Sequence, residues 1–392
     1  MQILQLVNIG FEAGGAEKSV RVIRDGLRGR GHEVQVVAST RLLSGEPYDQ
    51  DVFADHLVPM VSGRGPARAL GYLWHREAYQ RISTVMREFR PDCVHLHTIG
   101  EFSPAALLAT KDCPRILTVH GPESWTRDLL RWNLPSATSG SLSAADRALL
   151  LYLACVQRPA FLPLIRRVDR VIAPSRYFAE AVRADIGRVP VHVLANGIEK
   201  TAVATPVPET AYVVYVGRLE RVKGVHILLD AYRRLIEQVP EARLGIVGDG
   251  RERADLEAGA ADLVASGGVR FLGWQDQASV SRELAAASVV VLPSLWPENF
   301  PTVALEALQH GRPLVGSRVG GIPELIGPDN GALVEPGDPA ALARELARLL
   351  GDPRLSAELG RGSAARSERY GVEEFLDAVL THYQEVAAPC ES

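Results

Sequence analysis

Short runs of β-branched residues alternate with longer amphipathic runs along almost the whole chain, and this alternation restricts the fold more than any other feature. In the first half the short runs are MQILQLVNI, HEVQVVAST, CVHLHT, RILTVHG, RVIAPS and VHVLANG. Between the first two, apolar residues recur at Val20, Ile23 and Leu27, which is helical spacing, and the stretch ends at Gly31. Apolar strands separated by helices predict a parallel sheet that is buried on both faces.

A change of composition at residues 197–210 divides this alternation into two parts. The segment GIEKTAVATPVPET is rich in Pro, Thr and Ala and has little periodicity, which predicts an interdomain linker. The alternation then restarts, with expected strands AYVVYVG, RLGIVG, VRFLG, SVVVLPS and RPLVGSR. We therefore predict an α/β fold of two doubly wound, Rossmann-like domains, residues 1–196 and 211–372, facing a central cleft. An amphipathic helix follows within residues 373–392.

Composition narrows the class of protein. The chain has 392 residues, is 46% apolar and carries a net charge of −4, so its bulk charge gives no indication of nucleic-acid binding. None of its four cysteines forms a CxxC pair, which argues against a zinc site or a disulfide framework. Residues 1–9 have the pattern of a strand rather than a signal peptide, and no apolar run approaches about 18 residues. We therefore expect a cytosolic protein without a membrane-spanning helix, and the predominance of Arg over Lys indicates a bacterial genome.

Glycines follow the first strand, at a place where doubly wound sheets bind ligands. Gly14 and Gly15 precede a helix whose amino terminus favours a phosphate, although a plain tight turn explains the pair equally well. The pair does not form a GxGxxG pattern, and no acidic residue follows the second strand. Nicotinamide binding is therefore disfavoured.

Two cations follow the first strand of the second half. Arg218 and Lys223 are flanked by Gly217 and Gly224, in a turn that leads to a helix. A forked guanidinium and a compact ammonium that converge there suit a diphosphate. No metal-ligand cluster lies near them in the sequence, so we expect these cations to neutralise a leaving group in place of a metal. The alternative is a pair of solvated surface charges.

The stretch PENFPTVALEALQHG, residues 297–311, places two carboxylates around a helix start. Pro301 suits the first helical position, so Glu298 is expected in the preceding loop and Glu306 in the second turn. The N–H groups of Thr302 and Val303 then lie free at the positive end of the helix dipole. Carboxylates that contact vicinal hydroxyls hold sugars, so the arrangement predicts a sugar site, although two glutamates at this spacing also arise by chance.

Three further positions follow strands. Gly248 belongs to the tight Asp-Gly turn of IVGDG, and formation of this turn is by itself a sufficient reason for a glycine there. Trp274 follows VRFLG, where it either stacks on a base or packs in the interior. His120 ends LTVHG, where it contacts a sugar, carries a proton, or is a satisfied core histidine.

Taken together, these segments resemble family 4 of the retaining glycosyltransferases. The resemblance is strongest from residue 212 to residue 340, through VVYVGRLERVKGVHILLDAY, RLGIVGDG, VRFLGW, VVLPSLWPENFPTVALEAL, GRPLVGSRVGGIPELI and GALVEPGDPAALA. In the first half GGAEKSV, LTVHG, VIAPSRYFAE and LANGIE are similar to the family's segments. Each segment alone is unspecific, but the whole series in this order and spacing is highly specific.

The resemblance implies the GT-B fold, with the donor bound to the second domain and a final helix that crosses back to the first. It implies a metal-independent retaining transferase that uses a nucleoside-diphosphate sugar, with UDP or GDP as the expected carrier and no cofactor. The catalytic residues would be His120, Arg218, Lys223 and Glu298. The donor-binding residues would be Gly14, Gly15, Gly248, Trp274, Asn299, Phe300, Pro301, Thr302, Val303 and Glu306.

The same resemblance assigns a part of the donor to each group. Glu306 would hold the ribose hydroxyls and Glu298 the hydroxyls of the transferred sugar. Arg218 and Lys223 would take the diphosphate, with help from the Gly15 backbone. Trp274, or its backbone, would lie at the base.

The acceptor is the part that the sequence constrains least. Residues 122–165 match no segment of the family and contain WTRDLLRWNLP and RALLLYLACVQRPAFLPLI. Arg and Trp interleaved with Leu suit a lipid surface, or helices around a soluble acceptor such as a natural-product core, and the low density of basic residues favours the soluble case. The expected partners are a nucleoside-diphosphate sugar and a hydroxyl acceptor, with peripheral contact to the inner membrane face as an alternative. Two other functions stay open at this point, a sugar-nucleotide epimerase or phosphorylase and a non-catalytic sugar-nucleotide-binding subunit.

Overall fold

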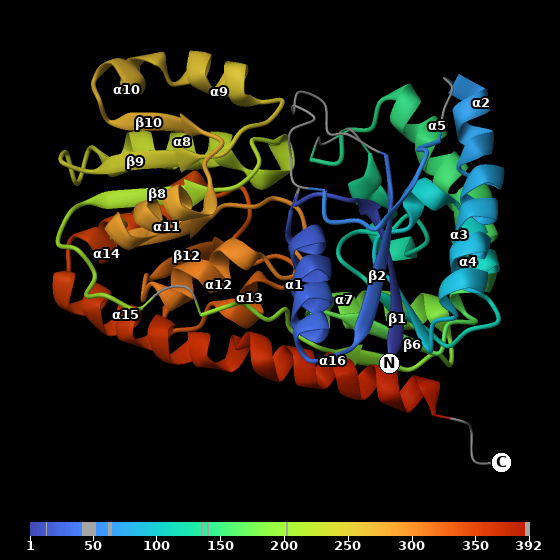
Figure 1. Cartoon of the computed structure of the whole chain (residues 1–392). Helices are drawn as coiled ribbons and strands as arrows, with labels where there is room; N and C mark the ends of the chain where they lie inside the picture. The colour runs from blue at the N-terminus through green and yellow to red at the C-terminus, as the bar shows by residue number, and fades with distance from the viewer. Residues whose placement is uncertain are drawn as a thin grey trace. The chain divides into compact units, whose positions relative to one another are not determined.

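The structure, a computed structural model, describes residues 1–12, 14–40, 52–61, 65–134, 136–138, 141–200 and 203–388. The chain divides into two compact units, which we call unit 1 (Met1–Gly197 with Val372–Ser392) and unit 2 (Ile198–Gly371). Each unit has its own parallel sheet with helices packed against it (Figure 1).

Unit 1 contains a seven-stranded parallel sheet with the strand order β3-β2-β1-β4-β5-β6-β7. Its strands are β1 (Gln2–Ile9), β2 (Glu33–Ser39), β3 (His56–Val58), β4 (Cys93–Leu96), β5 (Arg115–Thr118), β6 (Arg170–Ala173) and β7 (Val191–Val193). The strand order reverses between β1 and β4. In doubly wound sheets, ligands bind at the carboxyl ends of the strands at such a point.

The helices of unit 1 cover both faces of this sheet. They are α1 (Gly15–Gly29), α2 (Gly65–Gly71), α3 (Arg76–Phe89), α4 (Ala105–Ala109), α5 (Ala144–Tyr152), α6 (Arg158–Ile165) and α7 (Arg176–Ile186), with 3-10 turns at Gly100–Phe102 and Arg127–Asn133. One face packs against α3, α4, α6 and α7 in a core that includes Leu6 and Leu96. The other face packs against α1 and the last helix in a core that includes Ile3 and Ile116.

The last helix, α16 (Val372–Ala387), belongs to unit 1, as the GT-B resemblance implies. It lies beside α1 and contacts β4 and β5 (Figure 1). Its side chains Phe375, Leu376, Val379 and Tyr383 are buried, at the spacing of one helical face. Residues 389–392 of the predicted segment lie outside the described residues.

Unit 2 contains a six-stranded parallel sheet with the order β10-β9-β8-β11-β12-β13. Its strands are β8 (Tyr212–Val216), β9 (Arg243–Val247), β10 (Val269–Gly273), β11 (Val289–Leu292), β12 (Leu314–Ser317) and β13 (Gly331–Val334). Its helices are α8 (Val225–Leu235), α9 (Arg253–Gly259), α10 (Ala261–Ala265), α11 (Gln277–Ala286), α12 (Thr302–Gln309), α13 (Ile322–Leu325), α14 (Pro339–Leu350) and α15 (Pro353–Ser367), with 3-10 turns at Arg221–Lys223 and Glu368–Tyr370. The order of this sheet reverses between β8 and β11.

The segment predicted as a linker packs against unit 2 where it is described. The buried guanidinium of Arg312 donates to the carbonyl oxygens of Thr205 and Pro206, each at 3.1 Å. A fully buried guanidinium needs such acceptors, so it holds this stretch of chain on the unit. Residues 201 and 202 of the segment lie outside the described residues.

A long apolar helix in unit 1 differs from the sequence prediction. Helix α5, a π-helical turn (Leu153–Gln157) and α6 form one continuous helix from Ala144 to Ile165. It has 22 residues, and its most apolar 18-residue window has a mean hydropathy of 1.6, so by length and composition alone it is a candidate membrane span. The sequence prediction did not foresee this helix because it looked for an unbroken apolar run, whereas a helix stays apolar overall with a few charged residues inside it. Only 22% of its most apolar window is buried.

Candidate active site

Two loops of unit 2 meet where its strand order reverses. The loop after β8 carries Lys223, and the loop after β11 carries Glu298. The N–H of Leu295 donates to the carbonyl oxygen of Val222 at 2.8 Å, which ties the two loops together. Gly224 has a φ of +73°, and a Cβ on it would lie 2.0 Å from a carbonyl oxygen of the other loop. Glycine is therefore required for this close approach.

Lys223 and Glu298 form an ion pair inside this junction. The Lys223 Nζ lies 2.6 Å from Glu298 Oε1, and the Ser294 hydroxyl donates to the same oxygen at 2.7 Å. The two charged side chains are only 16% and 12% exposed. The Lys223 Nζ also lies 4.9 Å from the centre of the Trp296 ring, a cation–π arrangement.

The charge of Glu298 is set by two opposing effects. Burial alone would raise the pKa of its carboxyl group, because a charged group loses hydration. The Lys223 ammonium and the hydrogen bonds from Lys223 and Ser294 act in the opposite direction, and the net result is a lowered pKa. Glu298 is therefore ionised at neutral pH and can only accept hydrogen bonds.

A glycine pair on a neighbouring loop fixes the backbone of Glu298. The N–H of Gly321 donates to the carbonyl oxygen of Glu298 at 2.7 Å. Gly320 has a φ of +59°, and a Cβ on it would lie 2.3 Å from the same oxygen. Because neither the φ nor the space suits a side chain, Gly320 allows this loop to support Glu298.

Helix α12 begins soon after Glu298 and carries the second carboxylate. Pro301 is its N-cap residue, with φ −66° and ψ 118°, so the helix starts one residue later than predicted. The extended ψ of Pro301 excludes it from the helix, and Thr302 and Val303 form the first turn. Glu306 lies in the second turn and is 9% exposed. By helix geometry the N–H groups of Thr302 and Val303 have no acceptor within the helix, whereas that of Ala304 donates to the Pro301 carbonyl oxygen at 3.1 Å.

Arg218 occupies a different setting from Lys223. Its guanidinium pairs with Glu220 at 2.9 Å, and its side chain is 50% exposed. The sequence prediction places both cations on one diphosphate, whereas here they have separate partners, Glu220 and Glu298. Arg218 is exposed enough to change partner when an anion arrives.

The other predicted donor residues of unit 2 fall into an exposed and a buried group. Trp274 directly follows β10 and is 67% exposed, so the alternative of interior packing was wrong. Asn299 and Phe300 are each 7% exposed, and the Phe300 ring lies 5.5 Å from the ring of Tyr370. Gly248 has a φ of +127°, and a Cβ on it would lie 2.0 Å from a backbone oxygen of the loop after β8, so close packing requires this glycine.

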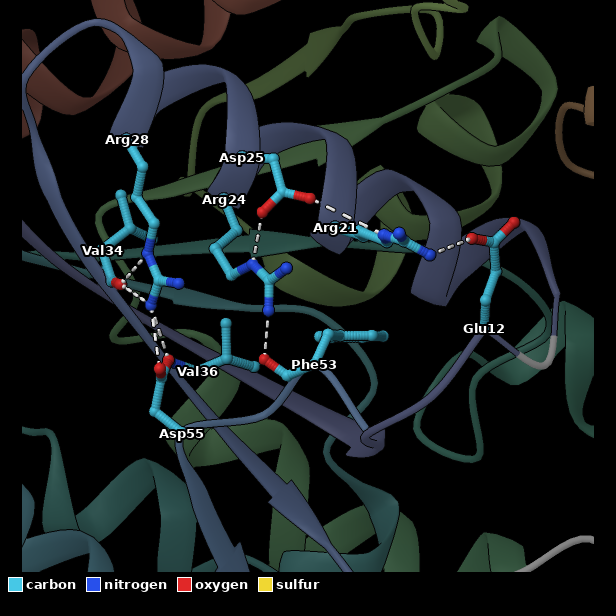
Figure 2. Close-up of polar contacts among 9 residues, drawn as sticks. All are labelled: Glu12, Arg21, Arg24, Asp25, Arg28, Val34, Val36, Phe53 and Asp55. Atoms are coloured by element: carbon cyan, nitrogen blue, oxygen red, sulfur yellow. Dashed lines mark hydrogen bonds and ion pairs between the residues drawn. The ribbon is translucent and has the colours of Figure 1, made fainter. Parts of the chain in front are cut away.

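In unit 1, Gly14 is the N-cap residue of α1 and Gly15 is its first residue. Figure 2 shows how arginines on the exposed side of α1 hold this helix. Arg28 Nε donates to the Val34 carbonyl oxygen at 2.9 Å and the guanidinium pairs with Asp55 at 2.9 Å (Figure 2). These contacts fix the last turn of α1 relative to β2 and to Asp55.

His120 lies just beyond the end of β5 and is partly buried. Its Nε2 lies 2.9 Å from Nδ1 of His97, and Nε2 of His97 lies 3.0 Å from Oε1 of Gln5. His95 is held between Tyr383 and Thr118, at 2.6 Å and 2.7 Å. Burial lowers the pKa of His120 to about 4 and that of His97 well below its usual value, so both are neutral.

The sequence prediction missed Ser294, His97 and Gln5. Two patterns would have found the last two. His95 and His97 stand two residues apart at the end of an expected strand, so both side chains lie on one face, and Gln5 is a polar residue between the apolar Leu4 and Leu6 of another strand. Only the register, which pairs Gln5 with His95, brings them together.

Comparison with known proteins decides the family. The model of the family "Glycosyltransferase Family 4" matches residues 13–201, and the model "Glycosyl transferases group 1" matches residues 198–366. The chain belongs to family 4 of the glycosyltransferases. Its two doubly wound units are those of the GT-B fold.

Three relatives of this glycosyltransferase family illustrate the similarity. Glycogen synthase of Mycobacterium tuberculosis is 32% identical over 288 residues, which cover 71% of this chain and 65% of that protein. Phosphatidyl-myo-inositol mannosyltransferase of Mycolicibacterium smegmatis is 27% identical and covers 95% of this chain and 91% of its own length. The structure of Anabaena HepE with UDP and glucose superposes with a TM-score of 0.71 at 22% identity, covering 98% of this chain and all of that one. This last likeness concerns the fold alone.

Proposed function

We propose that this family 4 protein is a retaining glycosyltransferase that moves a sugar from a nucleoside diphosphate to a hydroxyl group, without a metal. The observation that carries the proposal is the Lys223–Glu298 pair, buried at the strand-order reversal of unit 2 beside the amino terminus of α12. The pair holds one cation for a diphosphate and one carboxylate for sugar hydroxyls at the same junction.

A bound donor changes the partners of this pair. The negative charge of the diphosphate competes with Glu298 for the Lys223 ammonium, and Arg218 adds a second cation from the exposed edge. Glu298, which is ionised, then accepts hydrogen bonds from hydroxyls of the sugar. Glu306, in the second turn of α12, is the proposed partner of the ribose.

The reaction follows from where charge develops. The bond from the anomeric carbon to the phosphate oxygen breaks, and negative charge grows on the diphosphate. Lys223, Arg218 and the first-turn N–H groups of α12 stabilise that charge. The acceptor oxygen bonds to the anomeric carbon on the leaving-group face, and its proton passes to the departing phosphate oxygen, so the anomeric configuration is retained.

The donor and the metal independence are tested together. The proposed donor is a uridine or guanosine diphosphate sugar; the structure of HepE, which shares the fold, contains UDP and glucose. We expect one of a panel of UDP- and GDP-sugars to raise the melting temperature and to be turned over in excess EDTA. Activity that disappears in EDTA and returns with Mg²⁺ would contradict the metal-free mechanism.

For the acceptor, the exposed apolar helix favours a molecule at a lipid surface over a soluble one. Six of its exposed residues follow one side, namely Ala144, Ala148, Leu151, Cys155, Pro159 and Pro163, and Ala145, Arg147 and Val156 are exposed as well. Residues four apart stay on this side because the π-helical turn takes one residue more than an α-helical turn. Leu151 is 64% exposed, which is unusual for a leucine within an apolar helix.

The opposite side of the same helix is anchored in unit 1, so the helix lies on a surface and does not cross it. Arg158 pairs with the buried Asp185 and donates to the Trp125 carbonyl oxygen at 3.1 Å. Tyr152 donates to the Ala69 carbonyl oxygen at 3.0 Å.

The charged residues of this helix also suit a helix that lies flat on an anionic lipid surface. Arg147 on the helix and Arg166 and Arg167 after it are exposed, while the helix's one acidic residue, Asp146, is tied into a capping box with Ser143. Basic residues beside an apolar helical face bind anionic lipid surfaces. The relative named phosphatidyl-myo-inositol mannosyltransferase acts on a lipid by its name, which agrees with this proposal.

Vesicle binding tests the lipid surface. The protein should sediment with vesicles that contain anionic lipid, and Leu151→Glu should weaken that binding by roughly tenfold, since it places a charge in the apolar side. Val264→Glu is the matched control, because Val264 is an exposed apolar residue of a helix in unit 2 (42% exposed). Equal binding by both variants, or none by the native protein, would leave a soluble acceptor as the better proposal.

A further inference from the structure

A row of three side chains, the buried Gln5 and His97 and the partly buried His120, crosses the sheet of unit 1. Gln5 lies on β1, His97 follows β4, and His120 follows β5, which are three neighbouring strands. The rings of His97 and His120 are stacked, with centroids 5.2 Å apart and planes 26° from parallel. Gln5 and His97 are 0% and 1% exposed, so water does not compete for their hydrogen bonds.

The direction of each hydrogen bond follows from the first member of the row. With the Gln5 amide oriented so that Oε1 faces His97 and its Nε2 has no partner among the described residues, that oxygen can only accept, so the hydrogen of the neutral His97 ring is on Nε2. His97 Nδ1 then has only a lone pair. The bond of 2.9 Å from His120 Nε2 to this atom therefore needs a hydrogen on His120 Nε2.

From this row we infer that Gln5 and His97 are positioning residues that hold His120 in its Nε2–H tautomer and present its bare Nδ1 to a substrate hydroxyl. Nδ1 of His120 has no hydrogen-bond partner among the described residues. A bare nitrogen accepts from O–H but repels an anionic oxygen. His120 thus recognises a hydroxyl of a bound sugar or acceptor, and it neither binds phosphate nor supplies a proton to the leaving group. The identity of the hydroxyl-bearing substrate rests on the proposed glycosyl transfer. The tautomer of His120 follows from the hydrogen bonds alone and does not depend on that proposal.

The tautomer can be measured without any substrate. Protein with ¹⁵N-labelled histidine distinguishes a protonated ring nitrogen from a bare one by NMR, and a His120→Asn variant identifies the His120 signals. We expect His120 with hydrogen on Nε2 and a bare Nδ1 at pH 7.5, in the native protein. Hydrogen on His120 Nδ1 would overturn the inference, whatever the activity.

Kinetics then test the positioning role. His97→Asn keeps an oxygen that can accept from His120 Nε2, whereas His97→Leu keeps bulk and loses the acceptor. We expect His97→Leu to lower kcat by about two- to tenfold, the effect of one neutral hydrogen bond, and His97→Asn to recover most of it. Native-like thermal unfolding of both variants separates this from a folding defect. Equal losses in the two variants would overturn the role of the acceptor.

The two proposals fail in different ways. If no nucleoside-diphosphate sugar is consumed by the native protein, the proposed function fails while the predicted tautomer is still observed. If transfer is observed but His120 carries its hydrogen on Nδ1, the function stands and the positioning row is refuted.

Discussion

Replacing Lys223 with methionine perturbs the proposed donor site most directly, because methionine keeps an unbranched apolar chain but removes the charge. Glu298, whose side chain is 12% exposed, would be left as a buried carboxylate that still accepts from the Ser294 hydroxyl but has lost its cation. Removal of one partner of a buried ion pair costs about 3–5 kcal/mol. Because Ser294 still donates to the same oxygen, we expect the lower end, about 3 kcal/mol at pH 7.5.

The loss of stability caused by Lys223→Met depends on pH, because it depends on whether Glu298 is ionised. In the native protein Lys223 lowers the pKa of Glu298, so the pair stabilises the fold above the ordinary glutamate pKa of 4.5 and loses this effect as the pH falls through the lowered value. Without Lys223, burial raises that pKa, and the penalty is present at pH 7.5 but disappears when the carboxyl group is protonated. The stability difference between native and variant should therefore be largest near pH 7.5 and shrink towards pH 4.5.

Thermal unfolding at several pH values measures this. A loss of about 3 kcal/mol lowers the transition of a unit of this size by roughly 6–12 °C. Adding Glu298→Gln to the variant removes the unpaired charge and should recover much of the loss at pH 7.5. Lys200→Met is the matched control, because Lys200 pairs with Glu368 at 2.8 Å but both side chains are more than 60% exposed, so little change is expected. A Lys223→Met effect that is independent of pH, or is no larger than that of the control, would refute the reasoning.

Three other predictions concern the same unit, and they are checked by steady-state turnover, by calorimetry with a nucleoside diphosphate and by thermal unfolding, in that order. Lys223→Ala should also lower turnover by roughly 10²-fold or more, as removal of other groups that stabilise transition-state charge does, and near-normal turnover would exclude the diphosphate role. Trp274→Ala should weaken nucleotide binding by about 1–3 kcal/mol, the value of base stacking, and leave stability unchanged; unaltered affinity would place the base elsewhere. Gly320→Ala should destabilise unit 2 by more than about 1 kcal/mol, because its φ of +59° and the 2.3 Å approach to Glu298 exclude a side chain, and a neutral effect would show that the loop is not fixed.

The periodicity of the sequence was sufficient to predict two parallel, doubly wound units and a last amphipathic helix. Apolar side chains that alternate, or that recur at helical spacing, indicate which face of a single strand or helix is buried. The same local logic placed Glu298 in a loop and Glu306 in the second turn of α12, and it located Lys223 after a strand. A shift of one residue at Pro301 is the size of error expected when a cap is read from residue type alone.

What the sequence could not show were pairings between distant segments. The ion pair joins Lys223 to Glu298 across 75 positions, and His97 meets Gln5 across 92. Such contacts depend on strand order, register and close glycine packing, none of which leaves a local pattern. The exposure of helix 144–165 also could not be read from the sequence, because the sequence of an apolar helix does not show whether the rest of the protein covers it. Family membership and the candidate residues thus came from the chain's own order, whereas their charge states, partners and tautomers were decided by the folded packing, since hydration and hydrogen-bond partners are properties of the space around a group.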